Sequence, residues 1–182
     1  MEKCEFYGAC VLRRAIAGAE FSHPKRKGEL AELIFALKAA SLGLGVCKPY
    51  GENLPFDFVV ATEERLLRVQ VKSVFTRNRR EYFIRTGNPG VGRRRQYTSK
   101  NVDFIVAYLA AYDAWYIIPI GELGGRQSIP FHPDGVTRRD GGRFEKFREA
   151  WHLITSAQNL KPRRTRRKHN QNRPKAIMHF VL

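Results

Sequence analysis

The sequence of 182 residues predicts an α/β fold, and five segments carry that prediction. Residues 28–44 have the apolar spacing of an amphipathic helix. Residues 55–74 have the pattern of a β-hairpin, and residues 102–109 and 114–120 are two apolar segments typical of a buried sheet. Residues 144–154 repeat the helical spacing, so we expect a β-sheet flanked by helices.

The helix expected over residues 28–44 is the clearest single element. Two acids, Glu29 and Glu32, lie in its first turns. Carboxylates are favoured near the positive end of a helix dipole, so helix electrostatics is one explanation for both, and a functional role is the other. The apolar residues that recur three and four positions apart, and the glycines that close the helix, are Leu30, Leu33, Ile34, Leu37, Ala40, Gly43 and Gly45.

The hairpin expected over residues 55–74 brings polar groups onto one surface. A turn at residues 63 and 64 pairs Asp57 with Gln70, which puts their side chains about 5 Å apart. Lys72 lies on the same side of the second strand as Gln70, because side chains alternate along a strand. A carboxylate, an amide and an ammonium group are therefore expected to converge. The opposite side, which faces the core, is formed by Leu67, Val69, Val71 and Ser73.

The charge balance points to a polyanionic partner. The chain has 33 Lys and Arg against 17 Asp and Glu, a formal net charge of +16. Such a balance favours nucleic acid as the partner, a solvated basic tail being the alternative. Hydrophobic residues make up 43% of the chain, which excludes a wholly disordered protein.

Two segments concentrate the basic residues. Residues 76–100 contain one acid, Glu81, and residues 161–175 lie where the chain has no acid at all. Such segments suit the gripping of phosphates, although a charge run can also be merely solvated. The residues expected to bind nucleic acid are Arg77, Arg79, Arg80, Arg93, Arg94, Arg95, Tyr97, Lys100, Arg163, Arg164, Arg166 and Arg167.

The remaining features of the sequence concern the cellular location of the protein, its loops and Asp103. Three cysteines without a CxxC pair indicate neither a disulfide framework nor a zinc site, so a reducing cytoplasm is expected, with the protein at a bacterial or archaeal nucleoid. No apolar stretch is long enough for a membrane span. Residues 121–142 are expected to be loops. Asp103, at the start of a strand, either caps that strand or supports a nearby site.

The hairpin resembles the PD-(D/E)XK nuclease superfamily, whose motif is an acid followed on the next strand by acid-x-Lys. Pro55, Phe56 and Asp57 match the first part, and Gln70, Val71 and Lys72 match the second. Glutamine replaces the usual second acid, as in the branch that includes group I intron-associated homing endonucleases. Residues 27–32, KGELAE, also resemble the KGxxAE opening of archaeal Holliday-junction resolvases.

The resemblance implies a restriction-endonuclease-like core with a mixed central β-sheet. It also implies a Mg2+ site, with Mn2+ as a substitute, formed by Glu32, Asp57, the Gln70 amide oxygen and the backbone carbonyl of Val71. Glu29 is the reserve acid. Lys72 would then orient or deprotonate the attacking water, or stabilise the charge that develops on the phosphate.

The function that follows is a metal-dependent DNA endonuclease, preferably a homing enzyme and otherwise a junction resolvase, repair or restriction nuclease. A non-catalytic nucleic-acid-binding protein is the alternative from another class. Symmetric cleavage implies a homodimer or homotetramer, with no small-molecule substrate and no membrane partner. The expected division of the chain is an arm at 1–26, a nuclease core at 27–157 and a basic tail at 158–182.

Overall fold

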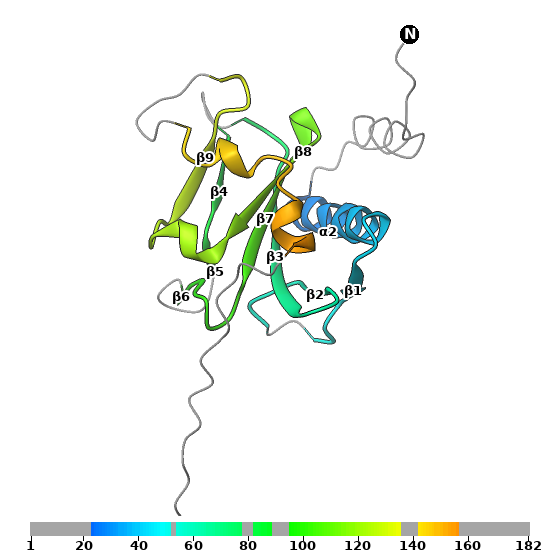
Figure 1. Cartoon of the computed structure of the whole chain (residues 1–182). Helices are drawn as coiled ribbons and strands as arrows, with labels where there is room; N and C mark the ends of the chain where they lie inside the picture. The colour runs from blue at the N-terminus through cyan, green and yellow to red at the C-terminus, as the bar shows by residue number, and fades with distance from the viewer. Residues whose placement is uncertain (1–22, 52–53, 78–81, 89–94, 136–141, 157–182) are drawn as a thin grey trace, which may run out of the picture.

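The computed structural model describes residues 23–51, 54–77, 82–88, 95–135 and 142–156, and its centre is one five-stranded sheet (Figure 1). Strands lie in the order β1, β2, β3, β7, β8, and only the β3–β7 pair is parallel. The predicted α/β fold with a mixed sheet is thus confirmed. The strands are β1 (Gly45–Cys47), β2 (Phe58–Ala61), β3 (Leu66–Val74), β7 (Phe104–Leu109) and β8 (Ala114–Pro119).

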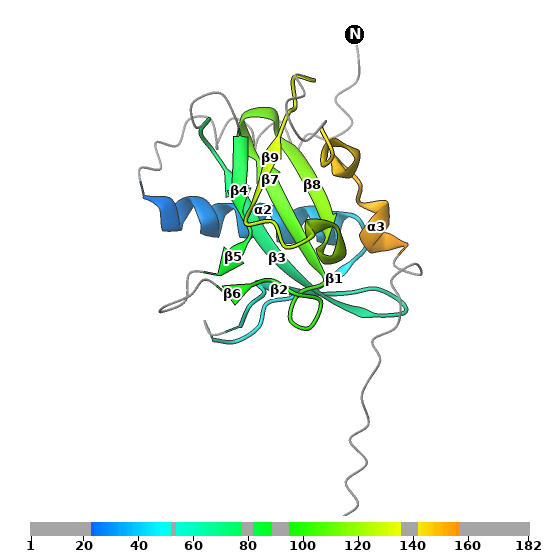
Figure 2. The same ribbon diagram turned by 90° about the vertical axis from the view of Figure 1, so that its left-hand side faces the viewer.

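Each face of the sheet is covered by a different layer. Helices α2 (Pro24–Ser41) and α3 (His152–Thr155) pack on one face. The other face is covered by a two-stranded sheet and two short 3-10 helices, and Figure 2 shows β4 and β9 in front of the sheet with α2 behind it. The elements of this layer and the remaining short ones are β4 (Tyr82–Arg85), β9 (Ser128–Phe131), η2 (Ile120–Leu123), η3 (Glu145–Phe147), β5 (Gly87–Asn88), β6 (Arg95–Gln96) and η1 (Ala110–Tyr112).

Helix α2 begins four residues earlier than the predicted start at 28. Pro24 occupies its first turn, where a residue without an N–H costs no hydrogen bond. The predicted apolar stripe is partly wrong, since Leu33 and Leu37 are 69% and 58% exposed. Phe35 sets the rotation of the helix instead, because it packs against three aromatic rings of the core. The buried residues of α2 are Ala31, Ile34, Phe35 and Ala39, and the rings around Phe35 are Phe58, Trp115 and Trp151.

The β2–β3 hairpin has the predicted register. Phe58 pairs with Val69, and Ala61 pairs with Leu66. The Thr62 backbone N–H closes the turn on the Arg65 carbonyl at 2.8 Å. The predicted core side of β3 is buried at Leu67, Val69 and Val71 and half-buried at Ser73. Strands β7 and β8 are buried almost throughout, as their apolar sequences predict.

The expected single helix over 144–154 is wrong. Its aromatic stripe is core, as predicted, but Glu149 has a φ of +50° and separates η3 from α3. One oxygen of the Glu149 carboxylate accepts the Trp115 backbone N–H at 2.7 Å. The other accepts the indole N–H of Trp151 at 2.9 Å. These two bonds hold the chain in a left-handed conformation at the point where a helix would continue.

The expectation that 121–142 is all loop is also wrong, because β9 lies within it and pairs antiparallel with β4. Ile129 and Phe131 of β9 are buried, while Pro130 and Ser128 make the segment look like a turn in sequence. The described segments contain no helix long and apolar enough to cross a membrane. Residues 1–22 and 157–182 lie outside the described part, so the predicted arm and tail stay predictions.

Candidate active site

Asp57 and Gln70 meet across the β2–β3 ladder, as the predicted register requires. The Asp57 backbone N–H donates to the Val69 carbonyl at 2.9 Å, which extends the ladder by one residue beyond β2. The Gln70 amide then donates to Asp57 Oδ2. The same carboxylate oxygen accepts the backbone N–H of Val71 at 2.7 Å. Asp57 is therefore fixed in orientation by two donors from β3.

The Asp57 carboxylate is held in an environment that resists its charge. Burial raises its pKa, and the Glu32 carboxylate raises it further. The backbone N–H of Val71 opposes this rise, with smaller contributions from Lys72 and Gln70. The hydrogen bonds and the Lys72 charge around Asp57 therefore do not offset the effect of burial on its carboxylate.

Lys72 lies two residues beyond Gln70 on the same side of β3. Its ammonium stands 5.6 Å from the centre of the Tyr97 ring. Burial lowers the pKa of Lys72, while the nearby Asp57 and Glu32 carboxylates act against that change. Burial, with the Asp57 charge, also raises the pKa of the Tyr97 phenol to about 12. Lys72 is thus a partly desolvated amine between two acids and an aromatic ring.

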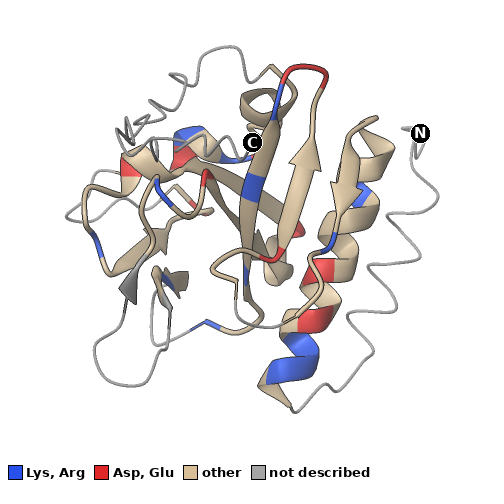
Figure 3. Cartoon of the chain, turned by 90° about the horizontal axis from the view of Figure 1, so that it is seen from below, with Lys and Arg blue, Asp and Glu red and all other residues tan. Residues whose placement is uncertain are grey.

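Helix α2 supplies the second acid. The two acids of α2 follow a basic first turn, which Figure 3 shows along the helix. Glu32 is only 23% exposed and pairs with Lys48 at 2.8 Å, whereas Glu29 is exposed. Glu32 acts on the pKa values of both Asp57 and Lys72, and Glu29 contributes to neither. The electrostatic influence on Asp57 and Lys72 therefore comes from Glu32 and not from Glu29.

The donor set fits a hard divalent cation. In the described part of the chain no three His, Cys, Asp or Glu side chains gather, so a metal would depend on two carboxylates plus neutral oxygens. The Gln70 amide nitrogen lies 3.2 Å from the Val71 carbonyl and also bonds Asp57 Oδ2. Asp57 Oδ2 and the Val71 carbonyl oxygen, which both belong to the predicted ligand set, thus accept from the same Gln70 amide nitrogen. Oxygen ligands of this kind suit Mg2+.

Comparisons with known proteins decide the family. The chain matches the PD-(D/E)XK endonuclease family over residues 22–154. The chain belongs to this family. Its structure is similar to that of the bacterial homing endonuclease I-Ssp6803I, with 31% identity, a TM-score of 0.66 and coverage of 76% of this chain and 99% of the other. The sequence matches no curated protein. The resemblance drawn from the Asp57, Gln70 and Lys72 motif is confirmed.

The predicted DNA-binding residues of this endonuclease fall into four groups. Arg77 and Lys100 are exposed, and the Arg77 guanidinium lies 5.6 Å from the Tyr82 ring. Tyr97 is only 7% exposed, so its ring is engaged within the protein. Arg95 lies in β6. The others lie outside the described residues: Arg79, Arg80, Arg93, Arg94, Arg163, Arg164, Arg166 and Arg167.

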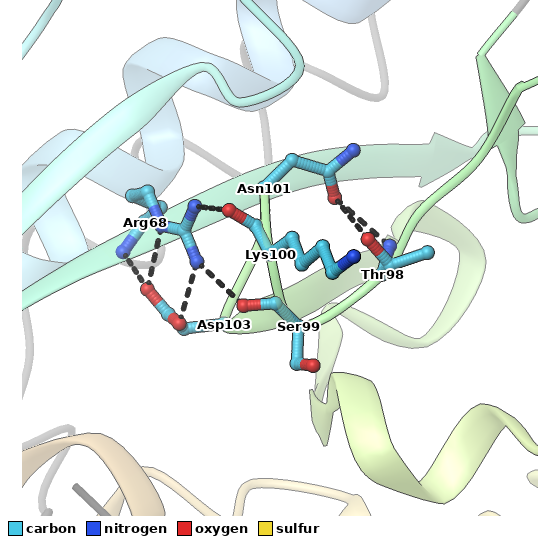
Figure 4. Close-up of polar contacts among 6 residues, drawn as sticks. All are labelled: Arg68, Thr98, Ser99, Lys100, Asn101 and Asp103. Carbon is cyan, nitrogen blue, oxygen red and sulfur yellow. Dashed lines mark hydrogen bonds and ion pairs between the residues drawn. The ribbon is translucent and has the colours of Figure 1, made fainter. Parts of the chain in front are cut away.

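Sequence reasoning missed Arg68, which organises the chain beside the site. Its guanidinium donates to both carboxylate oxygens of Asp103, at 2.9 and 3.0 Å, and to the carbonyls of Ser99 and Lys100 (Figure 4). Asp103 also accepts the Arg68 backbone N–H at 2.9 Å, so it serves the start of the strands, as its position suggested. Arg68 therefore fixes the turn that follows Tyr97. The signal was its place on the polar side of β3, two residues before Gln70.

Sequence reasoning also missed Lys48, which follows β1 and pairs with Glu32. Hydrogen bonding to Glu32 raises the pKa of Lys48, against the effect of burial. Asp57 and Glu29 add to the rise. No pattern in the sequence marks this lysine, because the contact joins residues 16 positions apart through the packing of α2 on β1.

Proposed function

We propose that this endonuclease hydrolyses phosphodiester bonds of DNA with a divalent metal, in the manner of a homing endonuclease. The observation that carries the proposal is the contact of Asp57 with Gln70 across the ladder, with Lys72 beside them. A module that only bound DNA would gain nothing from half-buried carboxylates in so basic a protein, because they repel phosphate unless a cation intervenes.

Glu32, Asp57, Gln70 and the carbonyl of Val71 would hold the metal. Mg2+ is preferred for this set of oxygens, and Mn2+ is a substitute. When bound, the metal supplies Lewis-acid stabilisation of the phosphate and activates water. For Gln70 to hold the metal, its amide oxygen would have to face the cation in place of the nitrogen that donates to Asp57 here. Because Gln70 is neutral, Glu32 carries more of the charge than it would in a site with three acids.

Lys72 is the residue that takes up the proton of the attacking water. Its lowered pKa leaves more neutral amine at working pH than an exposed lysine would have. The Tyr97 ring, 5.6 Å from Nζ, restricts where the amine can point. Asp57 and Glu32 keep the protonated form accessible, so Lys72 can take up a proton and then return it.

The DNA is held by the basic residues that the sequence concentrates in two segments. Exposed Arg77 and Lys100 are described contributors, and the further phosphate contacts are Arg79, Arg80, Arg93, Arg94, Arg95, Arg163, Arg164, Arg166 and Arg167. Such contacts set affinity and register without reading sequence. Cleavage of both strands would require two copies of the site, so we propose a homodimer or homotetramer in the cytoplasm.

The test uses a pooled library of genomic DNA and a synthetic four-way junction, each incubated with protein and Mg2+. Sequencing of the new ends should show recurrent cut positions for the parent and for Lys146→Ala, an exposed lysine whose partner is Glu122. Lys72→Ala should bind DNA and leave no new ends. Binding without cleavage by the parent, in Mg2+ and in Mn2+, would support the non-catalytic alternative. Cleavage of the junction alone would favour a resolvase.

A further inference from the structure

Lys48 is a second lysine at the acids of the site, and it differs from Lys72 in its surroundings. Its ammonium lies 2.8 Å from Glu32 Oε2 and 5.8 Å from the centre of the Phe58 ring. The Lys48 side chain is 64% exposed, whereas Glu32 is 23% exposed. A solvated cation is thus held against a half-buried carboxylate.

The position of this ion pair conflicts with the use of Glu32 as a metal ligand. A divalent cation and the Lys48 ammonium would both be attracted to the same carboxylate, and each would repel the other. Ion pairs with so exposed a lysine are weak, because solvent screens them and a long side chain must be ordered. Lys48 can therefore leave Glu32 at small cost when a stronger cation arrives.

A released Lys48 has a second anionic partner within reach when DNA is bound. It extends from the chain directly after β1, the edge strand that neighbours β2, whose entry carries Asp57. A phosphate brought to Asp57 and Glu32 for cleavage would lie beside this exposed amine. Lysine is a good partner for phosphate because its point charge needs no fixed geometry.

We propose that Lys48 is a positioning residue that acts as the displaceable counter-ion of Glu32. Without metal, it neutralises Glu32 and keeps the carboxylate directed to the site. With metal and DNA, it exchanges Glu32 for a phosphate of the bound strand. The inference rests on the proposed metal-binding role of Glu32, and it adds an order of events to that role.

A purely structural role for Lys48 makes different predictions. As a tie between β1 and α2, the pair would affect only folding, and its loss would leave metal and DNA affinities unchanged. The exposed pair of Lys146 with Glu122, 3.4 Å apart, has the same chemistry on η3 and η2. Lys146→Ala is therefore the matched control for loss of one exposed lysine that forms an ion pair.

The experiment measures two affinities for Lys48→Ala and Lys146→Ala, each in the full-length protein. Calorimetry without DNA should show Mn2+ binding to Lys48→Ala tighter by roughly three- to tenfold, because the competing cation is gone. Binding of DNA in Ca2+ should be weaker, with the salt slope reduced by about 1. Lys48→Arg should resemble the parent, and Lys146→Ala should leave Mn2+ binding unchanged.

The outcomes separate this inference from the proposed function. Unchanged or weaker Mn2+ binding by Lys48→Ala, with a melting temperature close to that of Lys146→Ala, overturns the counter-ion role. Mn2+ binding by Glu32→Gln is the second measurement. If it loses Mn2+ binding while Lys48→Ala does not change it, only the inference about Lys48 fails. If Glu32→Gln binds Mn2+ as the parent does, the proposed metal site itself is wrong.

Discussion

Two charged clusters lie on strand β3, and they are built in opposite ways. At Arg68 the guanidinium meets Asp103 and two backbone carbonyls, so the cation and the anion satisfy one another directly. At Gln70 and Lys72, two and four residues further on, the carboxylate of Asp57 is met by an amide and a backbone N–H. Burial raises the pKa of Asp57 and lowers that of Lys72.

The two clusters differ in whether their charges remain available to a ligand. The Arg68 cluster uses its charges to join β3 to the turn before β7, and little remains for a ligand. In the Asp57 cluster, Lys48 meets Glu32 from solvent, while burial disfavours the charged forms of both Asp57 and Lys72. Perturbed groups of this kind collect at active sites, whereas mutually satisfied ion pairs are usually architectural. The comparison can be tested residue by residue.

The largest effect is expected from the acids of the Asp57 cluster. Glu32→Ala should reduce cleavage on the order of 10³-fold or more, nearly as much as Asp57→Ala, because the neutral Gln70 cannot replace a lost carboxylate. Single-turnover rates on a cleaved fragment, with protein in excess over DNA, measure this effect. Both variants should still bind DNA in Ca2+ within a few-fold of the parent.

Glu29→Ala is the matched control, since it removes an exposed acid from the same turn region of α2. It should cleave within about threefold of the parent, an effect the size of a surface charge change. Retained cleavage by Glu32→Ala together with loss in Glu29→Ala would reverse the assignment of the metal ligand.

The sequence predicted the parts of the fold whose patterns are local. The register of the β2–β3 hairpin followed from a turn and from alternation, and that register by itself puts Asp57 opposite Gln70. The buried strands β7 and β8 followed from apolar runs. The polar motif was predictable because Asp57 lies at the entry to β2, while Gln70 and Lys72 lie on the adjacent strand β3. One hairpin register therefore determines that Asp57 faces Gln70.

The predictions that were wrong, and the residues that were missed, concern features that depend on long-range contacts. The rotation of α2 is set by Phe35 against three aromatic rings from other elements, which periodicity alone cannot weigh. The break at Glu149 depends on the Trp115 backbone N–H, 34 residues away. Lys48 and Arg68 were missed for the same reason, because each acts through a partner that the chain brings from a distance. Glu32 was predicted as a metal ligand only through the family resemblance.

A smaller effect, on stability, is expected from the Arg68 cluster. Arg68→Met should lower the free energy of unfolding by about 2 kcal/mol, because it leaves a half-buried Asp103 carboxylate without its guanidinium. Urea denaturation measures this loss. Under conditions where it remains folded, the variant should keep the Mn2+ affinity of the parent, since no predicted metal ligand is touched.

Asp103→Asn and the double variant complete a thermodynamic cycle with Arg68→Met. We expect the two single losses to exceed what the double variant shows by about 1 kcal/mol, the coupling typical of residues in direct contact. A sum of independent losses would mean that the two side chains do not stabilise each other. Abolished metal binding in folded Arg68→Met would contradict the separation of the two clusters.

The smallest effect is expected from Asp57→Asn without metal, and its sign is opposite to that of Arg68→Met. The pKa of Asp57 is raised in the folded state, so the folded protein holds its proton more tightly than the unfolded chain, whose Asp pKa is about 3.9. Stability of the parent therefore falls as pH rises from that value through the raised pKa, and the deficit persists at neutral pH. Asn carries no such charge, so the variant should be more stable at pH 7 by on the order of 1 kcal/mol.

Chelator and metal distinguish this electrostatic cause from a simple packing gain. In EDTA the advantage of Asp57→Asn should shrink as pH falls through the raised pKa of Asp57, and it should be lost below about 4, where the parent carboxyl is protonated in the folded and the unfolded chain alike. With excess Mg2+ the order should reverse, because only the parent gains the free energy of metal binding. An advantage that stays the same at about pH 3.5 and pH 7 would mean that the charge of Asp57 does not cause the difference in stability. An advantage that survives Mg2+ would mean that Asp57 does not bind the metal.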